Sequence, residues 1–134
     1  MTQALGAAGV GPDEVHLVNA HGTSSRLGDE VEADALLEVF KGAKSPPLIQ
    51  STKGLLGHTL WAAGAIEAVV CLAQMHVGRV HPNANLVKPV REGLSFVGPD
   101  ALEKELGVVL TNSFGFAGIN SAIVLRNGEV PRDG

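Results

Sequence analysis

Three polar, glycine-containing segments each follow a short apolar run in this chain, and this pattern limits the possible folds more than any other feature of the sequence. The apolar runs are residues 15–20, 48–51 and 107–112, and the polar segments are residues 21–25, 52–59 and 112–120. Short apolar runs bounded by turn residues are typical of buried strands. Ligand sites in open α/β sheets form where such strands end. The sequence therefore predicts an α/β domain in which three loops converge on one pocket.

Helices are expected between these strands. Residues 29–40 carry acidic side chains in the first turn, which the helix dipole favours, and an apolar face made of Val31, Ala35, Leu36, Val39 and Phe40. Residues 59–77 predict a second helix, whose only charged residue between Leu60 and Met75 is Glu67, so it should be buried nearly all round.

The remaining segments complete the predicted order. A short helix over residues 2–10 and a last strand over residues 120–126 give α-β-α-β-α-β-β, which indicates a mixed sheet with layered helices. Residues 52–57 are expected to form a loop and residues 94–97 a short strand. The polar tail from Asn127 is expected to fray.

The composition excludes several classes of protein. An apolar content of 45% over 134 residues favours one globular domain, residues 1–134. The net charge is −4 and the basic residues are scattered, which argues against nucleic acid as a partner. No apolar run approaches the ~20 residues of a membrane span, and no signal peptide is visible. The single cysteine, Cys71, fits a reducing compartment, so a cytoplasmic location is expected.

Two histidines lie in the polar segments. His21 is followed by Gly22, so the chain can turn sharply and expose the imidazole, which can donate a hydrogen bond or move a proton near pH 7. Alternatively, it simply ends the strand. His58 follows Gly57 at the expected start of a helix, where a neutral ring is favoured and could stabilise an oxyanion. The alternative is a solvent-facing helix start.

Other polar and aromatic residues have two interpretations each. Lys53 is an isolated cation that should pair with Asp29 or Glu32, unless it is an exposed surface lysine. Cys71 lies in the middle of an apolar helix and is interpreted as an inert core residue. The other histidines lack the spacing of metal ligands, so no metal site is expected. Phe114 and Phe116 could plug the core or line a substrate channel.

Taken together, the three polar segments resemble the motifs of the ketosynthases, the β-ketoacyl-ACP synthases of fatty-acid and polyketide synthesis. The matching stretches are residues 18–24 (VNAHGTS), residues 51–58 (STKGLLGH) followed by residues 62–65 (AAGA), and residues 112–120 (NSFGFAGIN). Gly28, Asp29 and Glu32 also match acidic positions of that family. The residues of these motifs most resemble those of the condensing enzymes that elongate fatty acids.

This resemblance implies a thiolase-like fold, in which two α/β halves, each with a five-stranded mixed sheet, pack around shared buried helices. The chain would be the C-terminal half, and the helix over residues 59–77 would pack against the other half. The catalytic residues would be His21, His58 and Lys53, with Lys53 holding a polar network through Glu32. That network would also include Thr23 and Asp29.

The resemblance also assigns the last polar segment to a substrate gate and oxyanion loop, with Phe116 as the gating residue. The loop residues are Phe114, Gly115, Phe116, Gly118 and Asn120. Two departures stand out, since Ala117 replaces a family glycine and Ile119 replaces a hydroxyl-bearing residue. If the backbone at position 117 needs a positive φ, an alanine adopts it less readily than a glycine does, because the alanine carries a Cβ. No cofactor or metal is implied, because the substrates are carried on the phosphopantetheine arm of acyl carrier protein.

The family's nucleophilic cysteine is missing. The resemblance therefore implies an enzyme that is inactive alone and is completed by a separate N-terminal half carrying the cysteine, in a heterodimer or heterotetramer. Such a chain should expose an apolar surface for its partner. A non-catalytic partner similar to chain-length factors, or a fragment of a longer synthase, are the alternatives. A degradative thiolase is disfavoured, because its C-terminal glycine-rich loop carries a cysteine that residues 113–120 lack.

Overall fold

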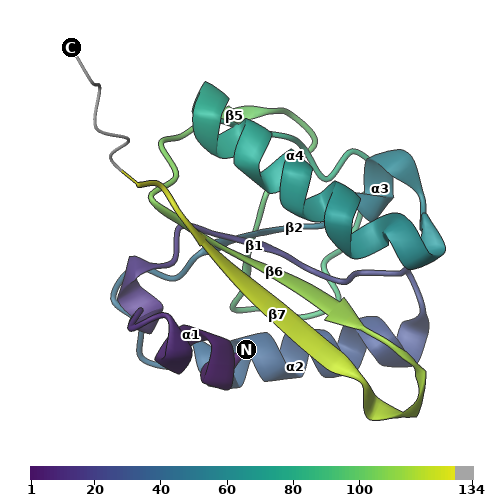
Figure 1. The fold of residues 1–134 in the computed structure, drawn as a ribbon. Coiled ribbons are helices and arrows are strands. Elements are labelled where there is room, and N and C mark those ends of the chain that lie inside the picture. The colour runs from purple at the N-terminus through teal and green to yellow at the C-terminus, as the bar shows by residue number, and fades with distance from the viewer. Residues whose placement is uncertain (129–134) are drawn as a thin grey trace.

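A five-stranded mixed sheet forms the centre of the molecule in the computed structural model, which describes residues 1–128 (Figure 1). Its strands follow the order β4-β2-β1-β6-β7, with β7 antiparallel to β6 and all other neighbours parallel. The strands are β1 (Leu17–Asn19), β2 (Leu48–Gln50), β4 (Ser95–Phe96), β6 (Val108–Phe114) and β7 (Asn120–Arg126). The predicted mixed sheet is therefore confirmed. The predicted fraying of the tail falls largely on residues 129–134, outside the described residues.

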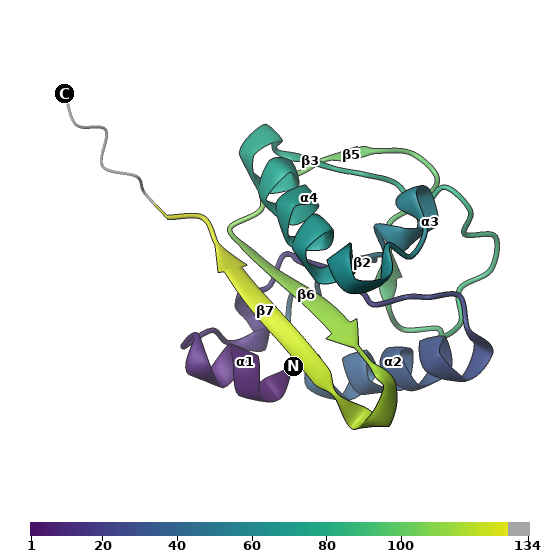
Figure 2. The ribbon, with the colours of Figure 1, turned by 45° about the vertical axis from the view of Figure 1, so that its right-hand side comes forward.

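Helices cover both faces of the sheet, as the layered pattern predicted. Figures 1 and 2 show α1 (Thr2–Ala7) and α2 (Arg26–Val39) on one face and α4 (Ala63–Val77) on the other. Beside the sheet, β3 (Arg79–Val80) and β5 (Leu102–Glu103) form a short antiparallel pair that the sequence did not predict. The short helical segments are η1 (Pro12–Glu14), α3 (Lys53–Leu56), η2 (Leu60–Ala62) and η3 (Phe116–Gly118).

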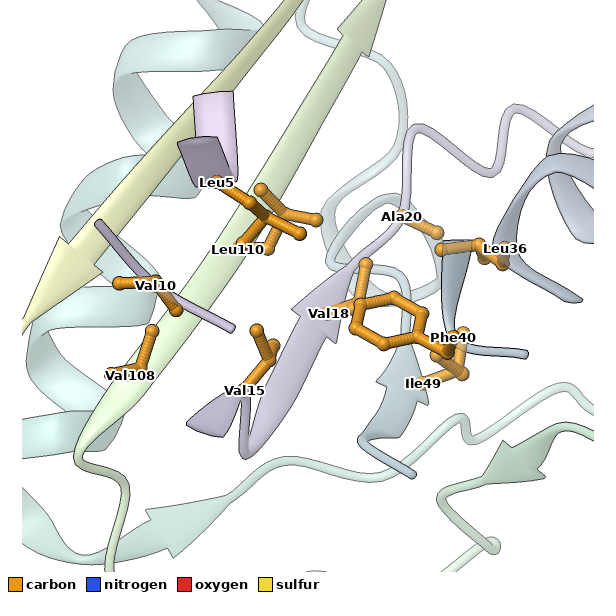
Figure 3. Packing of buried hydrophobic residues seen from close by; sticks show 10 residues of the cluster. All are labelled: Leu5, Val10, Val15, Val18, Ala20, Leu36, Phe40, Ile49, Val108 and Leu110. Atoms are coloured by element: carbon orange, nitrogen blue, oxygen red, sulfur yellow. The ribbon is translucent and has the colours of Figure 1, made fainter. Parts of the chain in front are cut away.

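Each face of the sheet has its own apolar core. Strand residues alternate between the faces, so Val18 joins the core beneath α1 and α2 while Leu17 joins the core beneath α4. Figure 3 shows the first core, in which Leu110 of β6 lies centrally and Leu36 and Phe40 approach from the α2 side. The second core includes Cys71 and Met75 of α4.

The helix facing the first core differs from its prediction. It begins at Arg26 rather than at residue 29, and Val31 of the predicted apolar face is 58% exposed. Leu36 and Phe40 of that face are buried as predicted, and the buried face also contains Glu32 and Ala33. Glu32 is buried because its carboxylate binds backbone N–H groups at the end of β1, which offsets its loss of water. Apolar periodicity alone could not indicate that partner.

The segment after β2 also differs, because part of the predicted loop over residues 52–57 is the short helix α3. The next long helix, α4, begins at Ala63, four residues later than predicted. Only one side of α4 is buried, so the prediction of a helix buried all round is wrong for the chain by itself. By length and composition alone, the 18 residues Leu60–Val77 are apolar enough to cross a membrane, which the sequence analysis did not anticipate. A core helix has the same composition, and here Glu67 lies within it, buried and ion-paired.

The position of Leu110 predicts a large loss of stability on truncation. Leu110→Ala should lower the free energy of unfolding by about 2–5 kcal/mol, because it leaves a cavity in a fully buried part of β6. Urea denaturation of the chain measures this loss. Leu27→Ala is the control, since Leu27 is 74% exposed, and it should change the unfolding free energy by less than about 0.5 kcal/mol. Equal losses for the two variants would contradict the described core.

Candidate active site

Three loops meet at one edge of the sheet, as the sequence predicted. β1 pairs in parallel with both β2 and β6, so the carboxyl ends of all three strands lie together. The imidazole rings of His21 and His58 have centroids 5.6 Å apart and meet edge to face at 89°. The ring of Phe114 is 5.7 Å from that of His21. Residues from the three motifs therefore surround one point.

The backbone of His21 is fixed by a buried carboxylate. Glu32 of α2 accepts the N–H of His21 on Oε1 and the N–H of Gly22 on Oε2, both at 2.9 Å. Asn112 of β6 donates to the same Oε1 at 3.1 Å. Gly22 has a φ of +40°, and a Cβ there would lie 2.7 Å from the hydroxyl oxygen of Ser51. A glycine is therefore required after His21.

The rest of the first loop is tied to the start of α2. The hydroxyl oxygens of Thr23 and Ser25 are 3.1 Å apart. Asp29 lies in the first turn of α2, as expected of an acidic residue there. Burial raises the pKa of Asp29 above its ordinary value, although the backbone N–H groups of residues 23–25 act in the opposite direction. Thr23 thus lies in the loop that carries His21 and Asp29 in the helix that follows it, and neither contacts Lys53 among the described hydrogen bonds.

Lys53 pairs with Glu67 and not with Asp29 or Glu32, so that prediction is wrong. The Lys53 ammonium donates to Oε1 of Glu67, and both side chains are almost fully buried. The physical reason is that the two glutamates lie on opposite faces of the sheet. Glu32 lies on the α2 face of the sheet and is engaged by backbone N–H groups, whereas Glu67 approaches from α4, next to α3. Lys53 is therefore no surface lysine.

The electrostatics of the site keep His21 neutral. Burial lowers the pKa of His21 from 6.5 to about 4, and the positive charge of Lys53 and the neighbouring His58 add to this. The Nδ1 atom of His21 is buried and has no hydrogen-bond partner among the described residues. A neutral ring can donate a hydrogen bond from one nitrogen and accept at the other.

His58 differs from its prediction in position. It lies between α3 and η2 rather than at the start of a long helix, and it is exposed. The backbone N–H of Leu60 donates to Nδ1 of His58 at 3.1 Å. Because Nδ1 accepts this bond, a neutral His58 ring carries its proton on Nε2, where it is free to donate to a ligand.

Phe114, the last residue of β6, is the phenylalanine whose ring lies beside His21. Phe116 is 99% exposed in the chain by itself, and its place next to the acyl site stays a prediction. Ala117 has a φ of 59°, which shows that this family glycine position does require the left-handed conformation that an alanine adopts at a cost. Gly118 also has a positive φ, and the N–H of Gly115 donates to the carbonyl of Ile119 at 2.7 Å. Asn120 begins β7 opposite Phe114.

A second polar network lies between the sheet and α4, and the sequence analysis did not predict it. Its side chains are those of Asn19, Thr52, His81 and Thr111. Thr52 donates to Oδ1 of Asn19 from both its backbone N–H and its hydroxyl, at 3.0 and 2.8 Å. The available signal was a polar residue at or just after an apolar run, as Asn19 is at the end of β1 and Thr52 is just after β2.

Cys71 is fully buried in α4, and burial raises the pKa of its thiol to about 12, with the charge of Glu67 adding to the effect. It is therefore an unreactive core thiol, as the sequence indicated. Within residues 1–128, no three His, Cys, Asp or Glu side chains gather in a way that could hold a metal ion.

Solved structures similar to this chain include ketosynthases. A β-ketoacyl synthase from Burkholderia phymatum superposes with a TM-score of 0.88 at 33% identity, covering 96% of this chain and 31% of that one. A type II polyketide ketosynthase, solved in complex with its acyl carrier protein, superposes with a TM-score of 0.86 at 32% identity, covering 96% of this chain and 32% of that one. The fold is therefore that of a thiolase-like ketosynthase half.

The sequence gives the same result at the level of the family. Residues 1–87 match the family described as "Beta-ketoacyl synthase, C-terminal domain", and the chain belongs to this family. The chloroplastic 3-oxoacyl-[acyl-carrier-protein] synthase I of Hordeum vulgare is 42% identical over 125 residues, which cover 92% of this chain and 27% of that protein. The chain thus spans between about a quarter and a third of the length of these relatives.

Single substitutions in the Lys53–Glu67 ion pair should destabilise the fold more than the double substitution does. Lys53→Met or Glu67→Gln alone should cost about 3–5 kcal/mol of unfolding free energy, because each leaves a buried group without its partner. The double variant should recover most of this loss. A double-mutant cycle by urea denaturation measures the coupling, and the exposed pair of Arg79 and Glu103 is the control, expected to couple by less than about 1 kcal/mol. Additive losses at residues 53 and 67 would rule out the ion pair.

The depressed pKa of His21 predicts its titration. The unfolded chain takes up a proton near pH 6.5 and the folded chain only near pH 4, so this group stabilises the fold above pH 6.5 and the contribution is lost as the pH falls toward 4. NMR titration should show a neutral His21 at pH 6. In the Lys53→Met/Glu67→Gln double variant, the pKa of His21 should rise, because Lys53 lowers it and Glu67 is not among the groups that shift it, but it should stay below 6.5, because burial remains. A wild-type pKa near 6.5 would contradict the described environment.

Proposed function

We propose that this chain is the half of a β-ketoacyl-ACP synthase that carries the two histidines and the lysine, and that it performs decarboxylative Claisen condensation when a second half supplies the nucleophilic cysteine. The observation that carries this proposal is the edge-to-face pair of His21 and His58 at the carboxyl edge of the sheet. A chain of the β-ketoacyl synthase family with that arrangement has the hydrogen-bonding groups that the reaction needs.

The two histidines act on the extender unit in this proposal. Malonyl thioester loses carbon dioxide, and the electrons of the broken C–C bond form an enolate. His58, free to donate from Nε2, and a neutral His21 donate hydrogen bonds to the thioester oxygen as its negative charge develops. The enolate carbon then attacks the acyl thioester carbonyl on the cysteine of the other half. The C–S bond breaks, and the cysteine leaves as the thiolate.

Lys53 helps to set the protonation state of this site. Burial does most to lower the pKa of His21 and the positive charge of Lys53 adds to it, while the charge of Lys53 is itself paired with Glu67. Glu32 has a different role. Its carboxylate accepts the backbone N–H groups of His21 and Gly22 and so fixes the position of the backbone from which the His21 imidazole extends. Thr23 and Asp29 support the connection between His21 and α2, the helix that carries Glu32. Phe114 is the aromatic residue that limits the space beside His21.

The other half would cover the apolar surface of α3, η2 and α4. That surface comprises Leu55, Leu56, Leu60, Trp61, Val69, Leu72 and Val77, all of them exposed in this chain. Contiguous apolar surface of this kind marks an interface rather than a solvent-facing face. We propose a heterodimer or heterotetramer with a cysteine-bearing N-terminal half. The same packing would occur within one chain if these residues were part of a longer synthase.

The substrates in this proposal arrive on acyl carrier protein. The solved ketosynthase in complex with its carrier supports such a partner for this chain. The phosphopantetheine arm brings the thioester to the histidines, so the proposed reaction needs no resident cofactor or metal and belongs in the cytoplasm, where carrier and thiol chemistry coexist. A non-catalytic role similar to that of chain-length factors is the competing function, and retention of His21, Lys53 and His58 favours catalysis.

The proposal is tested by co-expressing the chain with a cysteine-bearing N-terminal half and measuring native mass and the rate of malonyl-ACP decarboxylation. A stable complex should form, and His21→Ala or His58→Ala should slow decarboxylation about 10²–10³-fold, as loss of one oxyanion donor does. His76→Ala is the control, because His76 is exposed at the other end of α4, and its rate should match the unmodified complex.

Two results would overturn the proposal. A chain that stays monomeric and well folded beside the N-terminal half would exclude the split enzyme. A complex that forms but decarboxylates equally well without His21 and His58 would exclude their role and would favour the non-catalytic partner.

A further inference from the structure

His81 is the one histidine whose polar groups link three separate parts of the described fold. Its backbone N–H donates to Oε1 of Gln74 on α4 at 2.8 Å. Its ring Nδ1 lies 3.0 Å from the carbonyl oxygen of Pro82, and its ring Nε2 lies 3.1 Å from the hydroxyl oxygen of Thr52. The strand β3, which follows α4, carries His81 to this place. Both ring nitrogens and the backbone N–H therefore have partners, in a residue that is only half-buried.

The partner of His81 is the residue that precedes the lysine of the site. Thr52 lies two residues beyond the end of β2, directly before α3, and its carbonyl accepts the N–H groups of Leu55 and Leu56, both at 3.1 Å, which form the first turn of α3. Its N–H and hydroxyl reach Asn19 of β1, and Asn19 in turn donates from Nδ2 to the hydroxyl oxygen of Thr111 on β6 at 3.0 Å. Thr52 thus joins the sheet to α3, and Lys53 is the first residue of α3.

The number of protons that each group can donate limits the directions of the hydrogen bonds in this network. Pro82 offers only a carbonyl oxygen, so Nδ1 of His81 carries the proton that faces it. Burial lowers the pKa of His81 below its ordinary value, which favours a neutral ring whose Nε2 is then an acceptor. The Thr52 hydroxyl has a single proton to offer to Nε2 of His81 or Oδ1 of Asn19, while its backbone N–H reaches Oδ1 in either case. Without the histidine, the hydroxyl loses one of its two partners.

We propose that His81 is a positioning residue of this site, which acts through Thr52 to fix the first turn of α3, and with it Lys53, relative to β1. Lys53 must reach Glu67 in a buried pair, where a shift of the backbone by a small distance would separate the two charges. His81 belongs to the segment after β3, in which Asn83 also accepts the N–H of Ser51 and Asn85 donates to the carbonyl of Gly54 in α3. Among these three side chains, His81 is the one that contacts the side chain of Thr52. The importance of Lys53 rests on the proposed function, whereas the anchoring of α3 does not.

Three substitutions at position 81 separate this role from a general contribution to stability. His81→Gln keeps an amide group where Nε2 meets Thr52, His81→Asn keeps one only near Nδ1, and His81→Leu keeps neither but fills similar space. Amide hydrogen exchange of the chain, followed by NMR, is measured at residues 54–57 of α3 and, for comparison, in α1 and α2. His76→Gln is the matched control, because His76 is exposed on α4.

The expected result is local. Exchange at residues 54–57 should accelerate about fivefold in His81→Asn and His81→Leu, as the loss of one hydrogen bond predicts, and should stay near the wild-type rate in His81→Gln. Exchange in α1 and α2 should not change in any variant. Equal acceleration in all three variants, acceleration spread over the whole chain, or no acceleration in His81→Asn would each overturn the proposal.

A measurement on the unmodified chain keeps the proposal testable if the variants do not fold. The ¹⁵N shifts of the His81 ring should report one fixed neutral tautomer at pH 7, with the proton on Nδ1. A mixture of tautomers that titrates at the ordinary value for histidine would overturn the proposal, because a ring bonded to both Pro82 and Thr52 does not exchange freely. Amide exchange and ring ¹⁵N shifts do not depend on catalysis. A failure of the proposed function would therefore leave the anchoring of α3 by His81 intact, and a failure of the anchoring would leave the proposed function intact.

Discussion

The parallel pairing of β1 with β2 on one side and β6 on the other is the constraint on which the rest of the structure depends. It puts the ends of three strands at one edge of the sheet, so residues separated by up to 93 positions, His21 and Phe114, come within contact of each other. Parallel strands require long connections, and α2 and α3–α4 provide them on opposite faces. Those same connections deliver Glu32 and Glu67, the two buried carboxylates of the site, from opposite sides of the sheet.

The two carboxylates are compensated in different ways, and each solution suits its place. Glu32 accepts two backbone N–H groups, which fixes a loop without adding a positive charge near His21. Glu67 pairs with Lys53, whose positive charge helps to keep His21 neutral. A buried ion pair contributes little net stability, but its loss on one side is costly. The geometry of this pair is therefore sensitive to whatever holds α3 on the sheet, which is where the network of Asn19, Thr52 and His81 lies.

The exposed side of α4 gives the structure a second constraint. One side of this helix packs on the sheet through Cys71 and Met75, and the other presents Val69 and Leu72 to solvent, as the preceding η2 does Trp61. A helix that is apolar on both sides is suited to the middle of a larger assembly. In the proposed function, the second half would supply that cover, and the exposed Phe116 and the loop around Ala117 would meet it near the substrate.

The sequence by itself determined the order of the main helices and strands, the mixed sheet, the convergence of the three loops and the inert character of Cys71, because apolar runs and glycine-containing turns are local signals. It also marked Ala117 as an alanine at a family glycine position, and the structure shows the positive φ there. Tertiary structure alone decided which acidic residue Lys53 meets, which phenylalanine lies beside His21, and that His81 takes part at all. The physical reason is that a charge or a ring finds its partner across the sheet, and the face on which each residue emerges depends on packing between elements that no local pattern records.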